Sequence, residues 1–114
     1  MKKILVPVII LGCAAALNVS AVDAKANWDS LCAKCHGADG KGQTKVGQKL
    51  GIKDLTDAKV QAGIKDEDAI KAIKEGRKDQ DGKTLMKPFV NGADTPLSDD
   101  EVKALVAYVR GLKA

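Results

Sequence analysis

Aromatic residues are scarce in this 114-residue chain, which contains one Trp, one Tyr and one Phe. Large aromatic side chains supply much of the apolar area in a protein core. A chain of this length forms one small domain, and such domains usually need a disulfide, a metal or another bulky apolar component for stability. We therefore expect a component other than side chains to fill part of the core.

A strong excess of one charge is also absent. The chain has 19 basic and 15 acidic residues, and its lysines are dispersed among the acidic side chains. This pattern gives little support to nucleic-acid binding. The hydrophobic fraction of 45% and the charged fraction of 30% are typical of globular proteins. They argue against a disordered chain and against a protein with several membrane spans.

The long apolar run of the chain lies near its N-terminus. A basic start precedes the apolar residues 4–17, which make a short run for a transmembrane helix. The small-residue pattern Val22-Asp23-Ala24 provides a cleavage site. The sequence therefore predicts a signal peptide over residues 1–24. We expect the mature domain, residues 25–114, to be a periplasmic monomer.

Other interpretations of this N-terminal segment stay open. Cleavage after Ala26 is one alternative, and an uncleaved anchor helix is another. Gly12 and Cys13 also resemble part of a bacterial lipobox, in which the cysteine carries lipid, although the apolar run continues past Cys13. Membrane contact would come through that lipid or through a partner protein. Export is expected whether or not Cys13 is lipidated.

Helical periodicity organises the rest of the chain. Sustained alternation of apolar and polar residues is absent, so we expect an all-α fold with three main helices and long loops. Glycines from Gly37 to Gly51 and the charged residues 77–89 predict the loops. The expected main helices cover residues 26–35, 66–75 and 98–112, and a short turn with Thr56 as its cap covers residues 56–62.

The last helix has the clearest boundary signals in the sequence. Ser98 and Glu101 have the spacing of a capping box, in which each side chain bonds the other residue's backbone N–H. Val102, Leu105 and Val106 begin an apolar stripe at helical spacing. We expect this stripe to face the core.

Two cysteines and the only histidine cluster at Cys32-Ala33-Lys34-Cys35-His36. This order and spacing is the signature of covalent c-type haem attachment. Each thiol can add to one haem vinyl group, and the adjacent imidazole is brought to the iron. Export supports this interpretation, because bacteria attach haem of this type outside the cytoplasm. We expect one covalent haem c held by Cys32, Cys35 and His36.

Other uses of the two thiols are less well supported. A structural zinc site usually needs four protein ligands, and the mature chain has only three side chains of the favoured types. A thioredoxin-like redox centre belongs to a strand–helix setting that this sequence lacks. A plain disulfide would close a ring too short to restrict the unfolded chain strongly.

Met86 is the only methionine of the predicted mature chain. A thioether sulfur suits haem iron, so Met86 is expected to be the second axial ligand, opposite His36. Pro88 disfavours helical backbone at the residue before it, so Met86 is expected on extended backbone. The alternative role for Met86 is adaptable filling of the core.

The mature chain resembles a class I monohaem cytochrome c of the small bacterial type. The resemblance covers residues 26–114 and rests on the Cys32–His36 motif, the segment Met86-Lys87-Pro88-Phe89 and the signals of the last helix. It implies that the first and last helices cross and pair Trp28 with Leu105 and Tyr108. Many members have a proline whose carbonyl accepts the proximal histidine Nδ1–H. In this chain residues 47–51 take the place of that proline. This difference affects the rigidity of the loop and the reduction potential of the haem.

This resemblance implies a periplasmic one-electron carrier that is not itself an enzyme, because both axial positions of the iron are filled. A haem subunit docked to or tethered near a dehydrogenase or terminal oxidase is one alternative. If Met86 is not a ligand, an open-site gas sensor or peroxidase is the other. Redox proteins are the expected partners. An acidic docking surface on the partner would suit the lysines flanking the ligand sites, which are Lys34, Lys41, Lys45, Lys49, Lys83 and Lys87.

The surroundings of the haem can also be predicted. The apolar residues expected to line its pocket are Leu50, Leu55, Ile70, Ile73, Leu85 and Phe89. An apolar pocket lowers the local dielectric and raises the reduction potential. Arg77, Lys78 and Lys83 are candidates to pair with the haem propionates, although each also suits a solvated loop.

Overall fold

The computed structural model describes residues 23–114 of the chain. The predicted signal peptide, apart from its last two residues, and Cys13 lie outside the described residues. Within residues 23–114, every helix is too short or too polar to span a bilayer. Helices dominate the described chain, and the only strands in it form one small hairpin. The all-α fold class is thus confirmed.

The first helical segment is built from three pieces. These are α1 (Ala24–Asn27), a π-helix η2 (Trp28–Cys32) and α2 (Ala33–His36). The predicted helix over residues 26–35 is confirmed, but the π-helical turn was not predicted. The segment stops at Gly37, whose φ of 85° is a conformation that glycine adopts without steric cost.

Helix α3 (Lys45–Leu50) corrects the prediction of a continuous loop between Gly37 and Gly51. Thr44 caps the helix, because its side chain accepts a hydrogen bond from the Gly47 backbone N–H. Gly51 ends the helix in the left-handed conformation. The prediction was wrong because glycine usually disfavours a helix. Here Gly47 is part of α3, and the helix packs so closely against the Cys35 carbonyl that a larger residue has no room.

Helices α4 (Ala58–Ala62) and α5 (Asp66–Glu75) follow. The cap of α4 is Asp57, not the predicted Thr56. Thr56 instead donates its hydroxyl to Asp54, so its side chain is already used in a turn. The predicted helix over residues 66–75 is confirmed, and it ends at Gly76 with a φ of 75°.

A short antiparallel hairpin lies within the predicted charged loop. Strand β1 (Arg77–Lys78) pairs with β2 (Thr84–Met86), and Arg77 lies opposite Met86. Strands of two and three residues are too short to show alternation, which is why the sequence pattern missed them. The extended backbone predicted for Met86 is confirmed.

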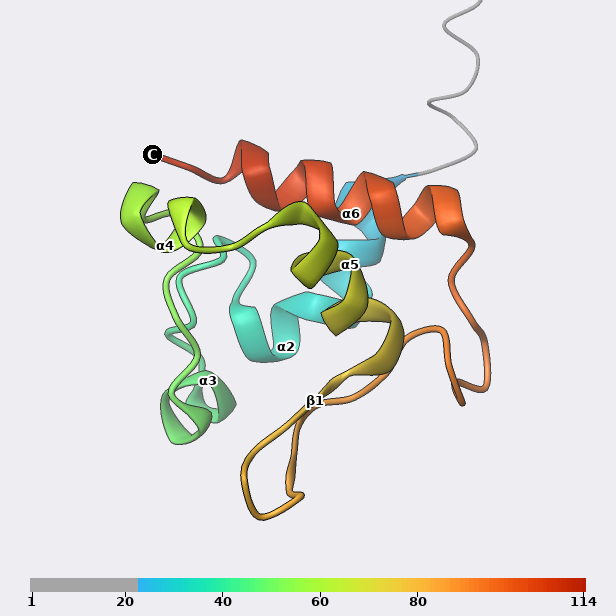
Figure 1. The fold of residues 1–114 in the computed structure, drawn as a ribbon. Coiled ribbons are helices and arrows are strands. Elements are labelled where there is room, and N and C mark those ends of the chain that lie inside the picture. Colours follow the sequence, from blue (N-terminus) through green and yellow to red (C-terminus); the bar gives the residue numbers. More distant parts are fainter. Residues whose placement is uncertain (1–22) are drawn as a thin grey trace, which may run out of the picture.

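Helix α6 (Asp99–Gly111) packs against α1 and α5, and Figure 1 shows it lying across the N-terminal helical segment. Trp28 contacts Tyr108 with ring centroids 5.4 Å apart, and Leu105 belongs to the same buried cluster. The helix pairing implied by the resemblance is thus observed. The buried cluster consists of Trp28, Cys32, Leu55, Ile73, Phe89, Val102, Leu105 and Val106.

A polar network joins the three later helices. The side-chain amide of Gln61, a buried residue of α4, donates to the carbonyl oxygens of Leu55 and Val109. Arg110 of α6 donates to both oxygens of Gln61 and forms an ion pair with Asp66 of α5. This network satisfies a buried amide, which would be costly to leave unpaired.

The capping box of α6 predicts a specific pH effect. Hydrogen bonds from the Ser98 backbone and the Asn27 amide lower the pKa of Glu101 below its ordinary value of 4.5. The stabilisation is therefore present above pH 4.5 and is lost as the pH falls through the lowered pKa. We expect Glu101→Gln to lower the free energy of unfolding by ~0.5 kcal/mol at neutral pH.

Urea melts of both proteins across the acid range test this effect. The two unfolding curves should converge as the pH falls below 4.5, the ordinary pKa of the group. A difference that stays constant down to low pH would contradict the role of the carboxylate charge.

Candidate functional site

Cys32 and Cys35 lie on the first helical segment, three residues apart. Cys32 is in the buried cluster, Cys35 is half-buried, and both thiols are free. The disulfide alternative is therefore not what the structure contains. Burial raises the pKa of the Cys32 thiol to about 11, and the neighbouring Cys35 adds to that shift. Cys32 is thus a neutral thiol at pH 7, which does not suit the low-pKa nucleophile of a redox enzyme.

His36 is the last residue of α2, directly beside Cys35. Its ring packs against Trp28 with centroids 5.5 Å apart. Burial lowers the pKa of the imidazole, which favours the neutral form that binds metals. Its Nδ1 atom is buried and has no hydrogen-bond partner among residues 23–114. Residues 47–51, which stand where the resembled family has a proline, therefore supply no acceptor for Nδ1.

The backbone on both sides of His36 is firmly held. The Thr44 hydroxyl donates to the Cys35 carbonyl at 2.6 Å, and the Trp28 indole N–H donates to the Gly37 carbonyl at 3.0 Å. The Gly42 N–H donates to the His36 carbonyl at 2.7 Å. Three consecutive carbonyls at the end of the motif are thus hydrogen-bonded.

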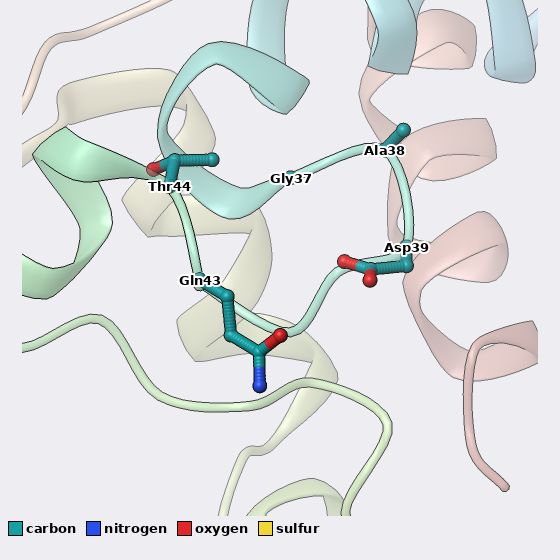
Figure 2. Close-up of a pocket in the computed structure, with 5 residues that line it drawn as sticks. All are labelled: Gly37, Ala38, Asp39, Gln43 and Thr44. Carbon is teal, nitrogen blue, oxygen red and sulfur yellow. The ribbon is translucent and has the colours of Figure 1, made fainter.

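The loop that follows His36 lines a shallow, open pocket, shown in Figure 2. The pocket has a volume of about 360 Å³. Its lining consists of Gly37, Ala38, Asp39, Gln43 and Thr44 and includes none of the four predicted haem-binding residues. The pocket therefore lies next to the motif in sequence but is not built from its ligands.

Met86 is positioned by α5 and by the turn that follows it. Its side chain is half-buried and packs against the buried cluster that contains Cys32. Backbone contacts bring the Met86 carbonyl close to Gly76, where there is no room for a Cβ atom. The Phe89 N–H then donates to the Ile73 carbonyl at 2.8 Å. The segment around Met86 is thus fixed to the end of α5.

The predicted pocket residues divide into two groups. Leu55, Ile73 and Phe89 are in the buried cluster, whereas Leu50, Ile70 and Leu85 are half-buried. Arg77, Lys78 and Lys83 are exposed and make no ion pair within residues 23–114. Figure 1 shows α3 and the hairpin extending from the same side of α2, away from α6.

The residues present fit a covalently attached haem. Two free thiols and an imidazole whose pKa is lowered by burial are adjacent on one helical segment. Within residues 23–114, no group of three or more His, Cys, Asp and Glu side chains is arranged to hold a bare metal ion. The donor set therefore suits an iron whose other ligands come from a porphyrin ring.

Two features of the site were not predicted from the sequence. They are the Thr44 hydrogen bond to Cys35 and the close approach of Gly47 to the motif. Thr44 precedes Gly47 by three residues, which is the spacing of an N-cap, so the cap was available as a sequence signal. The contact with Cys35 depends on the folded loop and had no local signal.

No curated protein matches the chain. One solved structure, "KustC0563 c-type cytochrome", is 38% identical, with a TM-score of 0.68 over 82% of this chain and 100% of that one. A tyrosine-to-phenylalanine variant of the same protein is also 38% identical, with a TM-score of 0.65 over 81% and 100% of the chains.

A protein-family model also matches most of the chain. The model described as "Cytochrome c" matches residues 21–113. Its span includes all four predicted haem-binding residues. The chain therefore belongs to the cytochrome c family, whose covalent haem c it carries as a single group for electron transfer.

Proposed function

We propose that this protein is an exported, periplasmic one-electron carrier. Cys32 and Cys35 would attach the haem, and His36 and Met86 would be the axial ligands. The observation that carries the proposal is the helical segment ending at His36, which has two free thiols beside a neutral imidazole. Met86 is the thioether packed against the same buried cluster as Cys32.

The residues around the site have distinct roles in this proposal. The haem iron, when bound, supplies reversible one-electron exchange. His36 and Met86 fill both axial positions, so a substrate has no route to the metal. The buried side chains of Leu55, Ile73 and Phe89 exclude water from the site. These properties favour a carrier over an enzyme.

Absorption spectra of the protein matured in a haem-attaching periplasm test the proposal. We expect a covalent c-type spectrum and the far-red ferric band of an iron–thioether bond. Covalent haem without that band would contradict the Met86 ligand and favour the open-site sensor or peroxidase. A protein without covalent haem would overturn the proposed site altogether.

Membrane fractionation tests the exported, untethered form of the proposal. We expect the mature protein in the periplasmic fraction, with the same distribution for the wild type and Cys13→Ala. A membrane-bound wild type that Cys13→Ala releases would contradict the free carrier and favour a tethered subunit.

Six lysines flank the predicted ligand sites, and all six are exposed. They are Lys34, Lys41, Lys45, Lys49, Lys83 and Lys87. A positive surface near the site would accelerate reaction with an anionic partner, and salt would screen this attraction. We expect the oxidation rate with an anionic metal complex such as ferricyanide to fall about tenfold between ~0.01 M and ~0.15 M salt.

A cationic redox complex is the matched control for this salt effect. Repulsion should slow its reaction, so added salt should leave the rate unchanged or increase it. Equal salt dependence for the two complexes, measured by stopped flow, would remove electrostatic steering from the proposal.

A further inference from the structure

The hydrogen bonds around His36 have an unusual distribution. In the described chain, the imidazole Nδ1 atom has no partner, so no bond from the ring itself fixes the orientation of the ring. The carbonyls of Cys35, His36 and Gly37 are all bonded instead. The constraint on the ring therefore acts through the backbone on both sides of it.

Two of the bonds to these carbonyls come from side chains on other parts of the chain, and the Gly37 carbonyl also accepts the Gly40 N–H at 3.1 Å. Trp28 is 2% exposed, and its indole N–H bonds to the Gly37 carbonyl nine residues further along. The same indole ring packs against the imidazole of His36. Trp28 thus holds both the side chain of His36 and the backbone that follows it.

Thr44 holds the other side of His36. Its hydroxyl donates to the Cys35 carbonyl and also accepts the N–H of Gly47. One hydroxyl therefore caps α3 and ties that helix to the end of α2. The hydroxyl uses its single donor and an acceptor lone pair in these two bonds, so both roles are satisfied at once.

We infer that Trp28 and Thr44 are positioning residues that set the orientation of the His36 imidazole relative to the haem. This inference rests on the proposed function, because it takes His36 as an iron ligand. It adds that the orientation of the imidazole depends on two side chains outside the Cys32–His36 motif. They take the place of a hydrogen bond from the ring itself, which normally fixes a metal-binding histidine.

Proton NMR of the ferric haem protein tests the inference. The paramagnetically shifted haem-methyl resonances report the orientation of the axial ligand planes. Trp28 is the only tryptophan, so it can be replaced by an analogue with sulfur in place of the indole N–H. This change keeps the shape of the ring and removes the donor. Thr44→Val likewise keeps the shape of the side chain and removes the hydroxyl.

We expect the haem-methyl shift pattern to change in both variants. Thr44→Ser restores the hydroxyl and should return the wild-type pattern. Val106→Ala is the control for stability alone, because Val106 is buried in α6 and is not hydrogen-bonded to the motif. It should lower the melting temperature and leave the pattern unchanged.

The outcomes separate this inference from the proposed function. A wild-type spectrum without the upfield methyl signal of a bound methionine would contradict the His36 and Met86 ligands themselves. With that signal present, an unchanged pattern in the Trp28 analogue or in Thr44→Val would overturn the positioning role of that residue. A pattern that shifts equally in Val106→Ala would show that only general stability matters.

Discussion

Replacing Met86 by alanine should open the iron to added ligands and lower its reduction potential. The variant keeps Cys32, Cys35 and His36, so the haem should remain covalently attached. In the proposed site, removing the Met86 thioether would deprive the ferrous iron of its preferred ligand. We expect the potential to fall by on the order of 0.2 V, within the range that axial ligands span. Potentiometry and carbon monoxide binding to the ferrous protein measure the two effects.

Val90→Ala is the matched control for this experiment. Val90 lies four residues from Met86, is half-buried as Met86 is, and packs against the same buried cluster. It is not one of the predicted pocket residues, so its truncation should reduce stability without exposing the iron, and carbon monoxide should not bind. If Met86→Ala kept the far-red ferric band and the wild-type potential, Met86 would not be the ligand.

A second large effect is expected on folding from Gly47→Ala. A Cβ atom at this position would lie 2.6 Å from the Cys35 carbonyl oxygen and 2.8 Å from the Thr44 hydroxyl. Both are closer than packed atoms approach, so α3 must move away from the motif. Such overpacking costs about 1–3 kcal/mol. We expect the melting temperature to fall by about 4–8 °C per kcal/mol in a domain of this size.

Gly63→Ala is the control, because it makes the same change without the close contacts. Its nearest neighbour would be the Val60 carbonyl oxygen at 3.6 Å, and its φ is ordinary. The control should therefore stay within about 0.5 kcal/mol of the wild type. Equal melting temperatures for Gly47→Ala and the wild type would show that α3 tolerates displacement from the motif.

The parts of the fold that could be predicted have strong local signals. Ser98 and Glu101 define the start of α6 by their capping box, and the structure contains both hydrogen bonds of that box. Helix α5 also ends where it was predicted, at Glu75, and Gly76 follows with a positive φ that glycine adopts without steric cost. In these cases the deciding interactions lie within four residues in the sequence.

The parts that could not be predicted depend on contacts between distant residues. Gly47 has no positive φ, and its role appears only when the Cys35 carbonyl packs against it. The hairpin also could not be predicted. Its two strands are too short to show an alternation of apolar and polar residues. For the motif residues Cys32, Cys35 and His36 the sequence alone is enough to make a prediction, since their spacing is a chemical requirement.

The candidate site follows the same division. The sequence predicts which side chains attach the haem, but not how their backbone is held. Trp28 was expected to pack against Leu105 and Tyr108, whereas its bond to Gly37 needed the folded structure. The absence of a partner for Nδ1 within residues 23–114 likewise needed the folded structure.

The π-helical turn Trp28–Cys32 accommodates one extra residue inside a continuous helical segment. A π-turn closes its hydrogen bond over one residue more than an α-helical turn. Each α-helical residue turns the chain by about 100°. Because the π-turn takes up the extra residue, α1 and α2 keep nearly the relative orientation of a regular helix that is one residue shorter, and α1 remains packed against α6. Removing one residue within this turn should therefore preserve the contact between α1 and α6, whereas removing one residue from α2 would rotate everything before it by about 100°.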